Sequence, residues 1–261
     1  TGYKPEFAAA AEAAASTGGQ IMPPIMGAAA FLMADYVQIP YSEIIVKAIL
    51  PAVLYFAGIF IAVHLEAKKL GLRGLTKDEL PEIKPLLKKS YLLAPLILLI
   101  YLVGTSTRSI QYAASLSIVA CIFVTLFSRE TRITPKRLLE ALAAGGQGPI
   151  TVAAACGVAG IIAGTITMTG LANMMINGIV ALAGSHVIIA LFLTMLCCIV
   201  LGMGVPTTAN YCIMAATCAP ILTSESIGIP MIAAHFFVFY FGIVADITPP
   251  VALAAYAGSA I

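Results

Sequence analysis

The chain has 261 residues, of which 61% are hydrophobic and 10% charged, and its formal net charge is +2. Soluble domains carry about 25% charged residues. This composition, together with a mean hydropathy of +1.01, therefore predicts an all-α polytopic membrane protein. All 14 Lys and Arg residues precede Ala141. Because nucleic-acid binding needs a basic surface, we expect no nucleic-acid partner.

The sequence contains no motif for catalysis or for ATP binding. It lacks G-x-x-x-x-G-K-[ST], H-E-x-x-H and G-x-S-x-G. Its six Cys residues all fall in apolar runs and form no C-x-x-C pair, and in such surroundings Cys behaves as a small hydrophobe. We therefore expect neither an enzyme nor a bound cofactor.

The chain opens with an Ala-rich helical pattern. Residues 7–33 predict a membrane crossing that is interrupted at 18–24, and residues 43–63 predict a second, uninterrupted crossing. No signal peptide is visible and the first residue, Thr1, is not Met, so we expect a fragment of a longer protein.

Two clusters of basic residues determine the predicted sidedness. Their members, in a loop at 66–90 and in the segment 129–137, are Lys68, Lys69, Arg73, Lys77, Lys84, Lys88, Lys89, Arg129, Arg132, Lys136 and Arg137. Two apolar runs, 91–103 and 110–127, separate the clusters and return the chain to the side that it left. Cytoplasmic loops carry the excess of Lys and Arg, so both clusters are predicted to face the cytoplasm.

Three elements are expected after the second cluster. A short interfacial helix at 137–144 precedes a crossing at 150–169 toward the outside, and a helix at 171–183 then lies on the outer face.

Two further apolar runs, 187–201 and 209–222, flank the sequence GMGVPTT and are too short for ordinary crossings. The economical interpretation is a re-entrant hairpin over 187–222 that enters from outside and has residues 202–208 as its tip. Unpaired backbone at that depth is tolerated only where it is buried in protein or lines a wet cavity. Two tilted spans joined by a Gly-Pro turn are the alternative.

A repeat with an offset of 226 residues aligns GGQIMPPIMGAA near the start of the chain with VADITPPVALAA near its end. In each copy the Pro-Pro pair ends one helix and suits the first positions of the next. We therefore predict two transmembrane helices broken near mid-membrane and running in opposite directions. Such an inverted repeat is typical of secondary transporters, whose binding sites lie at the breaks. Two ordinary Pro kinks in unrelated spans are the alternative.

These elements predict four parts of the chain. They are the end of a first repeat (1–65, with its broken helix and one span), the basic cytoplasmic loop (66–90), two connecting spans with the interfacial helix (91–148), and a second repeat (149–261, with the hairpin at 187–222 and a broken helix at 229–261).

The breaks offer oxygen ligands and helix ends but no basic side chain. Carbonyl and Thr oxygens suit a hard cation such as Na⁺, and a bound Na⁺ would supply the positive charge that an anionic substrate needs. The predicted Na⁺ ligands are Gly202, Gly204, Val205, Thr207, Thr208, Ala245, Thr248, Gly18, Gly19 and Met22. The predicted substrate contacts are Gln20, Pro23, Pro206, Asn210, Asp246 and Pro249.

Asp246 is an ionisable group at a predicted mid-membrane position, which is costly and points to function. The alternative is that it lies in a wet cavity or caps the helix that begins at Pro249.

Four separated motifs carry a resemblance to one family. They are TGYKPEFAAAAEAAASTGGQIMPPIMGAAAFLMADY, HLEAKKLGLRGL, LGMGVPTTANY and DITPPVALAAY. Together they resemble the large-subunit part of the fused permeases of tripartite ATP-independent periplasmic (TRAP) transporters. The resemblance extends over essentially the whole chain.

This resemblance implies a Na⁺-driven importer of organic acids, such as C4-dicarboxylates or related carboxylates, in the bacterial inner membrane. It implies a periplasmic substrate-binding protein, in fused permeases often of the TAXI type, and the remaining part of the same permease as partners. It also implies two inverted repeats and an elevator-like transport domain. The family's Na⁺ sites would fall on residues 202–208 with 245–249, and on 18–23 with a first hairpin that would precede Thr1.

Three other functions are compatible with parts of this pattern. A divalent-anion/Na⁺ symporter that needs no binding protein shares the hairpin and the inverted repeat. A channel or passive membrane scaffold is a second alternative, and an intramembrane enzyme, for which no nucleophile–base pair is visible, is the third.

Overall fold

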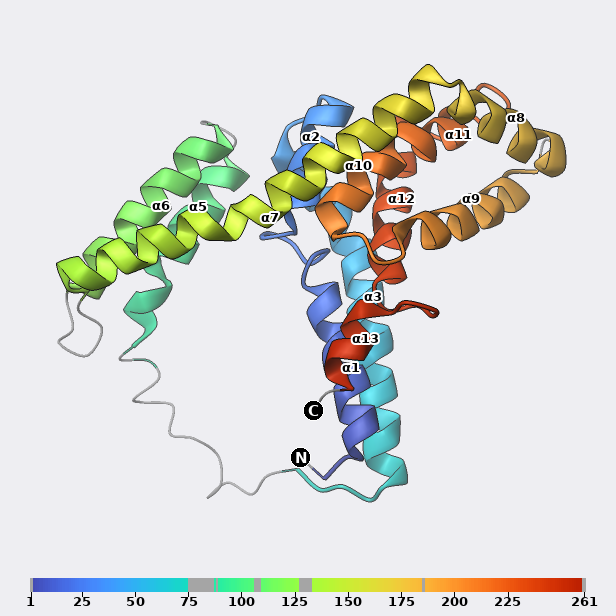
Figure 1. The fold of residues 1–261 in the computed structure, drawn as a ribbon. Helices are drawn as coiled ribbons and strands as arrows, with labels where there is room; N and C mark the ends of the chain where they lie inside the picture. Colours follow the sequence, from blue (N-terminus) through green and yellow to red (C-terminus); the bar gives the residue numbers. More distant parts are fainter. Residues whose placement is uncertain are drawn as a thin grey trace.

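The computed structural model describes residues 2–74, 87, 89–105, 109–126, 133–184 and 186–259. Within these ranges the chain forms helices and no strand, which confirms the all-α fold class (Figure 1). The elements are α1 (Pro5–Gly18), α2 (Ala28–Val37), α3 (Tyr41–Lys69), the 3₁₀ turn η1 (Ser90–Leu93), α5 (Ala94–Gly104), α6 (Ile110–Thr125), α7 (Pro135–Met168), α8 (Leu171–Ala183), α9 (Val187–Gly202), α10 (Thr207–Thr217), α11 (Ala219–Thr223), α12 (Met231–Ala245) and α13 (Leu253–Gly258). By length and composition, α3 and α7 could each cross a membrane.

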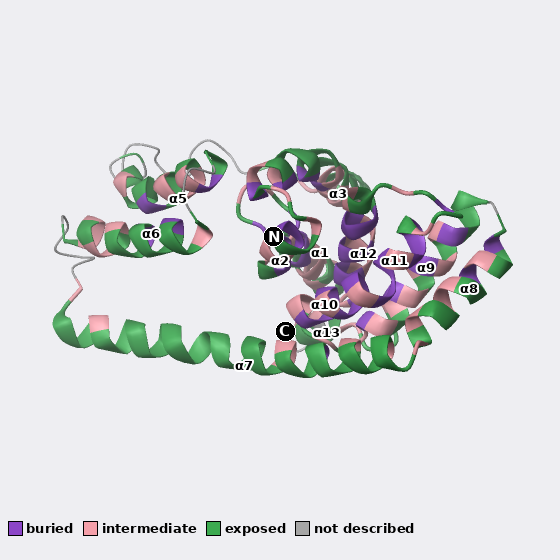
Figure 2. Ribbon diagram, turned by 90° about the horizontal axis from the view of Figure 1, so that it is seen from above, coloured by how far each residue is buried: buried purple, intermediate pink, exposed green. Residues whose placement is uncertain are grey.

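The core of the molecule lies where α2, α10 and α12 meet. Met33, Tyr211, Met214 and Phe239 from these three helices are each at most 1% exposed. Seen from above, buried residues concentrate in this region, whereas α7 is exposed along most of its length (Figure 2). Exposed apolar helix faces are expected for a protein whose solvent is lipid.

Helix α7 is longer than the sequence pattern predicted. An interfacial helix at 137–144 and a separate crossing at 150–169 were expected, but one helix of 34 residues covers both segments. Gly145, Gly146 and Pro149 weaken a helix locally without necessarily ending it. The boundary predicted between the connecting spans (91–148) and the second repeat (149–261) therefore falls inside a continuous helix.

The two apolar segments that flank GMGVPTT form helices that end close to their predicted bounds. The chain leaves helical geometry between Gly202 and Thr207, as the GMGVPTT sequence predicts. The second arm, expected as one helix over 209–222, is divided at Cys218 into α10 and α11. Pro220 lies at the start of α11 and lacks the backbone N–H that a continuous helix would use there.

Both predicted interruptions separate two helices. The first separates α1 from α2 and is closed by a 2.8 Å hydrogen bond from Gly27 N to Gln20 O. The second separates α12 from α13 and is closed by a 3.0 Å bond from Ala254 N to Asp246 O. The peptide bonds Pro23–Pro24 and Pro249–Pro250 are both cis.

The helices around the interruptions pair across the two sequence copies. Helix α1 packs against α13, and α2 packs against α12; the first pair lies side by side in Figure 1. A Cβ built on Gly258 of α13 would lie 3.4 Å from the carbonyl oxygen of Ala9 of α1. The first half of each copy thus contacts the second half of the other.

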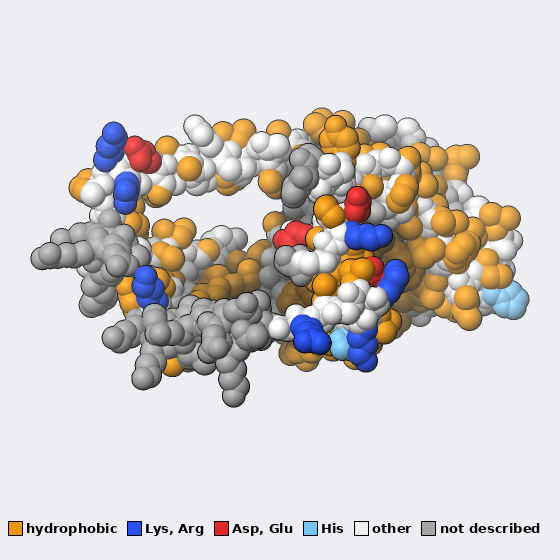
Figure 3. Space-filling view, turned by 90° about the horizontal axis from the view of Figure 1, so that it is seen from below, with side chains coloured by type: hydrophobic (Ala, Val, Ile, Leu, Met, Phe, Trp, Pro, Cys, Tyr) orange, Lys and Arg blue, Asp and Glu red, His pale blue; other side chains and the backbone are white. Residues whose placement is uncertain are grey.

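The described members of the two basic clusters are exposed. Figure 3 shows Lys and Arg side chains on the surface seen from below, and Lys68, Lys69, Lys136 and Arg137 are exposed. The start of α1 lies beside the end of α3, since the Tyr3 hydroxyl donates to Val63 O at 3.3 Å. Much of the predicted 66–90 loop and part of the second basic cluster lie outside the described residues.

Candidate functional site

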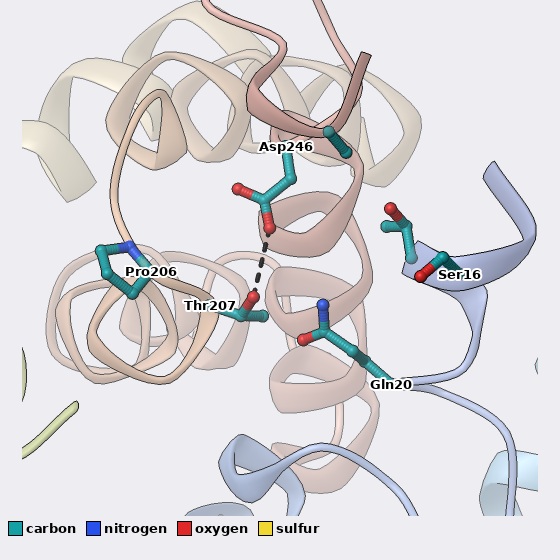
Figure 4. Close-up of a pocket in the computed structure, with 7 residues that line it drawn as sticks. Ser16, Gln20, Pro206, Thr207 and Asp246 are labelled. Atoms are coloured by element: carbon teal, nitrogen blue, oxygen red, sulfur yellow. Dashed lines mark hydrogen bonds between the residues drawn. The ribbon is translucent and has the colours of Figure 1, made fainter. Parts of the chain in front are cut away.

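A cavity of about 270 Å³ lies where several helix ends meet. Its lining residues are Ser16, Thr17, Gln20, Pro206, Thr207, Asp246 and Ala254. They come from the C-terminal end of α1, the N-terminal end of α10 and the C-terminal end of α12, and Ala254 comes from the start of α13 (Figure 4). The cavity therefore joins both helix interruptions to the connection between α9 and α10.

Asp246 is the one formally charged residue among the described residues that line this cavity. Its Oδ2 accepts a 3.1 Å hydrogen bond from Oγ1 of Thr207, and the Gln20 side chain points toward the same pair (Figure 4). Thr207 is the first residue of α10, so the carboxylate lies at a helix N-terminus, where the helix dipole stabilises negative charge. The C-terminal ends of α1 and α12, which attract cations, border the same space.

The end of α9 approaches α10 and α12 very closely. A Cβ built on Gly202 would lie 2.6 Å from Nδ2 of Asn210 and 2.8 Å from Cβ of Ala245. Asn210 is 0% exposed, and its Nδ2 donates to the carbonyl oxygen of Gly242 at 3.0 Å. Its Oδ1 is buried and accepts no hydrogen bond within the part of the chain that the structure describes. The polar atom of Asn210 that lacks a partner among the described residues is therefore a hydrogen-bond acceptor.

Comparison with protein families decides the identity of the chain. The model of the tripartite ATP-independent periplasmic transporter, DctM component, matches residues 1–261. The chain belongs to this family. Searches of curated proteins and of solved structures found no match.

Membership assigns this DctM chain to the membrane permease of a TRAP transporter and confirms the resemblance seen in the four motifs. It is a transporter family, which implies a membrane protein without an enzymatic role. Membership also implies a periplasmic binding protein and further permease subunits as partners.

The predicted site residues of the second copy divide into two groups. In the DctM chain, Pro206, Thr207 and Asp246 line the cavity. The others lie around it without lining it: Gly202, Gly204, Val205, Thr208, Asn210, Ala245, Thr248 and Pro249. Gly204 has a φ of +75°, which glycine adopts without steric cost. Thr248, which follows α12, donates its Oγ1 hydrogen to Val244 O at the end of that helix at 2.7 Å, so its hydroxyl hydrogen is already used.

Of the predicted site residues in the first copy, only Gln20 lines the cavity. Gly18 is buried against α3, and a Cβ built on it would lie 2.5 Å from a ring carbon of Tyr55. The Tyr55 hydroxyl in turn donates to Ala14 O at 2.9 Å. Gly18 therefore has a packing role in the structure, and Gly19, Met22 and Pro23 lie on the interruption outside the cavity lining.

Three lining residues were missed by the sequence analysis: Ser16, Thr17 and Ala254. A signal for two of them was present, because the hydroxyl side chains of Ser16 and Thr17 directly precede the Gly pair at the first interruption. Ala254 has no such signal, since Ala is common throughout the chain.

Proposed function

We propose that this DctM chain forms part of a Na⁺-coupled symporter that imports organic acids, C4-dicarboxylates or related carboxylates, across the bacterial inner membrane as a multi-pass protein. A periplasmic binding protein, of the TAXI type, delivers the substrate. The observation that carries the proposal is the cavity that joins both interruptions to the hairpin connection, with Asp246 and Thr207 hydrogen-bonded inside it.

The coupling role follows from the charges around this cavity. Asp246, hydroxyl groups and two helix C-termini favour a cation, and hard oxygen ligands match Na⁺. Among the described residues that line the cavity there is no basic side chain. An anionic substrate therefore binds more tightly once a cation is bound. This order of binding couples transport of the anion to transport of the cation.

The symmetry of the two copies supports alternating access. Adding the repeat offset of 226 residues to the bounds of α1 gives 231–244, against Met231–Ala245 for α12. The reciprocal contacts of α1 with α13 and of α2 with α12 are those that a two-fold relation requires. Inverted repeats related in this way place the site at their interface.

Uptake measurements test the proposed function. The full-length permease and its binding protein are reconstituted in proteoliposomes and given a panel of labelled carboxylates under an inward Na⁺ or K⁺ gradient. We expect uptake of one class of carboxylate that requires both Na⁺ and the binding protein. Uptake that persists in K⁺ would instead indicate a channel, and Na⁺-driven uptake without the binding protein would indicate a symporter of the divalent-anion type.

The hydroxyl group of Thr207 gives a sharper prediction. Replacing Thr207 by Ala removes the bond to Asp246 and one candidate Na⁺ ligand, so the half-saturating Na⁺ concentration for uptake should rise about 5- to 10-fold. Thr207→Ser keeps the hydroxyl and should change it less than two-fold. Thr167→Ala is the control, because Thr167 Oγ1 donates to Ala163 O within exposed α7. An unchanged Na⁺ requirement in Thr207→Ala would remove Thr207 from the site.

A further inference from the structure

Helices α10 and α12 are joined by three polar contacts. The first is the bond from Thr207 to Asp246 in the cavity, and the second is the bond from Asn210 to Gly242 O. The third lies farther from the cavity: the Tyr211 hydroxyl and Nδ1 of His235 share a hydrogen bond of 2.8 Å.

The third contact is buried in an apolar setting. Tyr211 is 1% exposed and His235 is 3% exposed. The ring of Phe239 packs against Tyr211 at a centroid distance of 5.7 Å, and the ring of Tyr36 from α2 packs against both partners. Burying a hydroxyl and an imidazole is unfavourable unless they are hydrogen-bonded, so neither group tolerates a displacement that separates the pair.

The contacts have a helical spacing that relates them to the cavity. Tyr211 lies four residues after Thr207, one turn along the same face of α10. His235 lies 11 residues before Asp246, which is about three turns of α12 and so returns to the same face. A change in the rotation or depth of α10 against α12 would therefore break the Tyr211–His235 bond and the Thr207–Asp246 bond together.

We infer that Tyr211 and His235 are positioning residues, whose hydrogen bond holds the hairpin arm at the depth where Thr207 meets Asp246. This inference rests on the proposed Na⁺ site in the cavity. The pair touches neither the cavity nor the ion, and it acts through the relative placement of the two helices. Tyr36 supports it from α2, so the placement also depends on the first sequence copy.

Substitutions of the pair should change Na⁺ affinity more than transport capacity. In the full permease with its binding protein, Tyr211→Phe keeps the ring and removes the hydroxyl. We expect the half-saturating Na⁺ concentration to rise about five-fold while the maximal uptake rate at saturating Na⁺ changes less than two-fold. His235→Phe should have the same effect, and the double variant should not exceed either single one, because both remove the same bond. His235→Asn, whose amide can occupy the position of Nδ1, should restore part of the affinity.

Tyr240→Phe is the matched control on α12. The Tyr240 hydroxyl is also buried, but it has no hydrogen-bond partner within the described residues, so its removal should leave the Na⁺ requirement unchanged. A lower melting temperature in Tyr211→Phe without a change in Na⁺ affinity would overturn the inference, since that result indicates a structural role alone.

A second measurement does not depend on Na⁺ coupling. In Thr207→Cys, the rate of maleimide labelling at position 207, followed by mass spectrometry, reports how α10 lies against α12. Adding Tyr211→Phe should raise this rate about five-fold, and an equal rate would contradict the inference. Na⁺-independent uptake by the wild-type permease would contradict the proposed function instead, so the two failures are distinguishable.

Discussion

Replacing Asp246 by Asn should raise the half-saturating Na⁺ concentration for uptake by about 30- to 100-fold. Asn has nearly the same volume and can still accept the hydrogen bond from Thr207, so the substitution isolates the negative charge. Interactions of a charged group in a protein contribute about 1.5–3 kcal/mol each, and every 1.4 kcal/mol corresponds to about ten-fold in affinity. Uptake by reconstituted full-length permease at a series of Na⁺ concentrations measures the effect.

Asp35→Asn is the matched control for this substitution. Asp35 lies exposed near the C-terminal end of α2, away from the cavity lining, so removing its charge should leave the Na⁺ requirement within two-fold of the wild-type value. An equal Na⁺ dependence for Asp246→Asn and the wild type would show that the carboxylate takes no part in ion binding.

Replacing Gly202 by Ala should destabilise the contact between the end of α9 and α12. The added methyl group would meet the Cβ of Ala245 at 2.8 Å and Nδ2 of Asn210 at 2.6 Å, and the first of these belongs to a helix backbone position that cannot move alone. Overpacking of this kind costs about 1–3 kcal/mol. We expect a lower melting temperature in detergent and uptake reduced at least ten-fold, since the Asn210–Gly242 bond is disturbed as well.

Gly160→Ala serves as the comparison for Gly202→Ala. A Cβ built on Gly160 in α7 meets no atom of the described residues within 4 Å, and Ala is the better helix former. Its melting temperature should equal or exceed that of the wild type. If Gly202→Ala kept wild-type stability and uptake, residues 202–208 would have to rearrange easily. That result would contradict the close packing described above.

The sequence predicted the elements whose ends carry a strong local signal. The helix at 171–183 has the bounds that were expected, because Gly170 and Gly184 flank it in conformations with positive φ. The non-helical segment after Gly202 was likewise visible in its Gly and Pro residues. The continuity of α7 was not visible in the sequence, since glycine, glutamine and proline within 145–149 are compatible with both a break and a weakened helix.

Four of the residues that line the cavity had been singled out in the sequence, but their arrangement had not. Thr207 was identified as an oxygen ligand for a hard cation, Asp246 as an ionisable group at a predicted mid-membrane position, and Gln20 as the counterpart of Asp246 in the first copy. That Asn210 faces Gly242 depends on the rotation of α10 and α12, which hydrophobic periodicity leaves open in uniformly apolar segments. That the Thr248 hydroxyl bonds back to Val244 O depends on the turn after α12. The contact of Tyr211 with His235 joins residues 24 positions apart and leaves no pattern in the sequence.

The length of α7, a candidate span by length and composition, limits how this helix could lie in a bilayer. At about 1.5 Å per residue, its 34 residues extend over a distance well beyond the hydrocarbon thickness of about 30 Å. Tilt alone seldom exceeds about 40° and does not absorb the excess. The 20 residues from 149 to 168 match the thickness, so the preceding turns, beginning at Lys136 and Arg137, should continue the helix into the lipid headgroups.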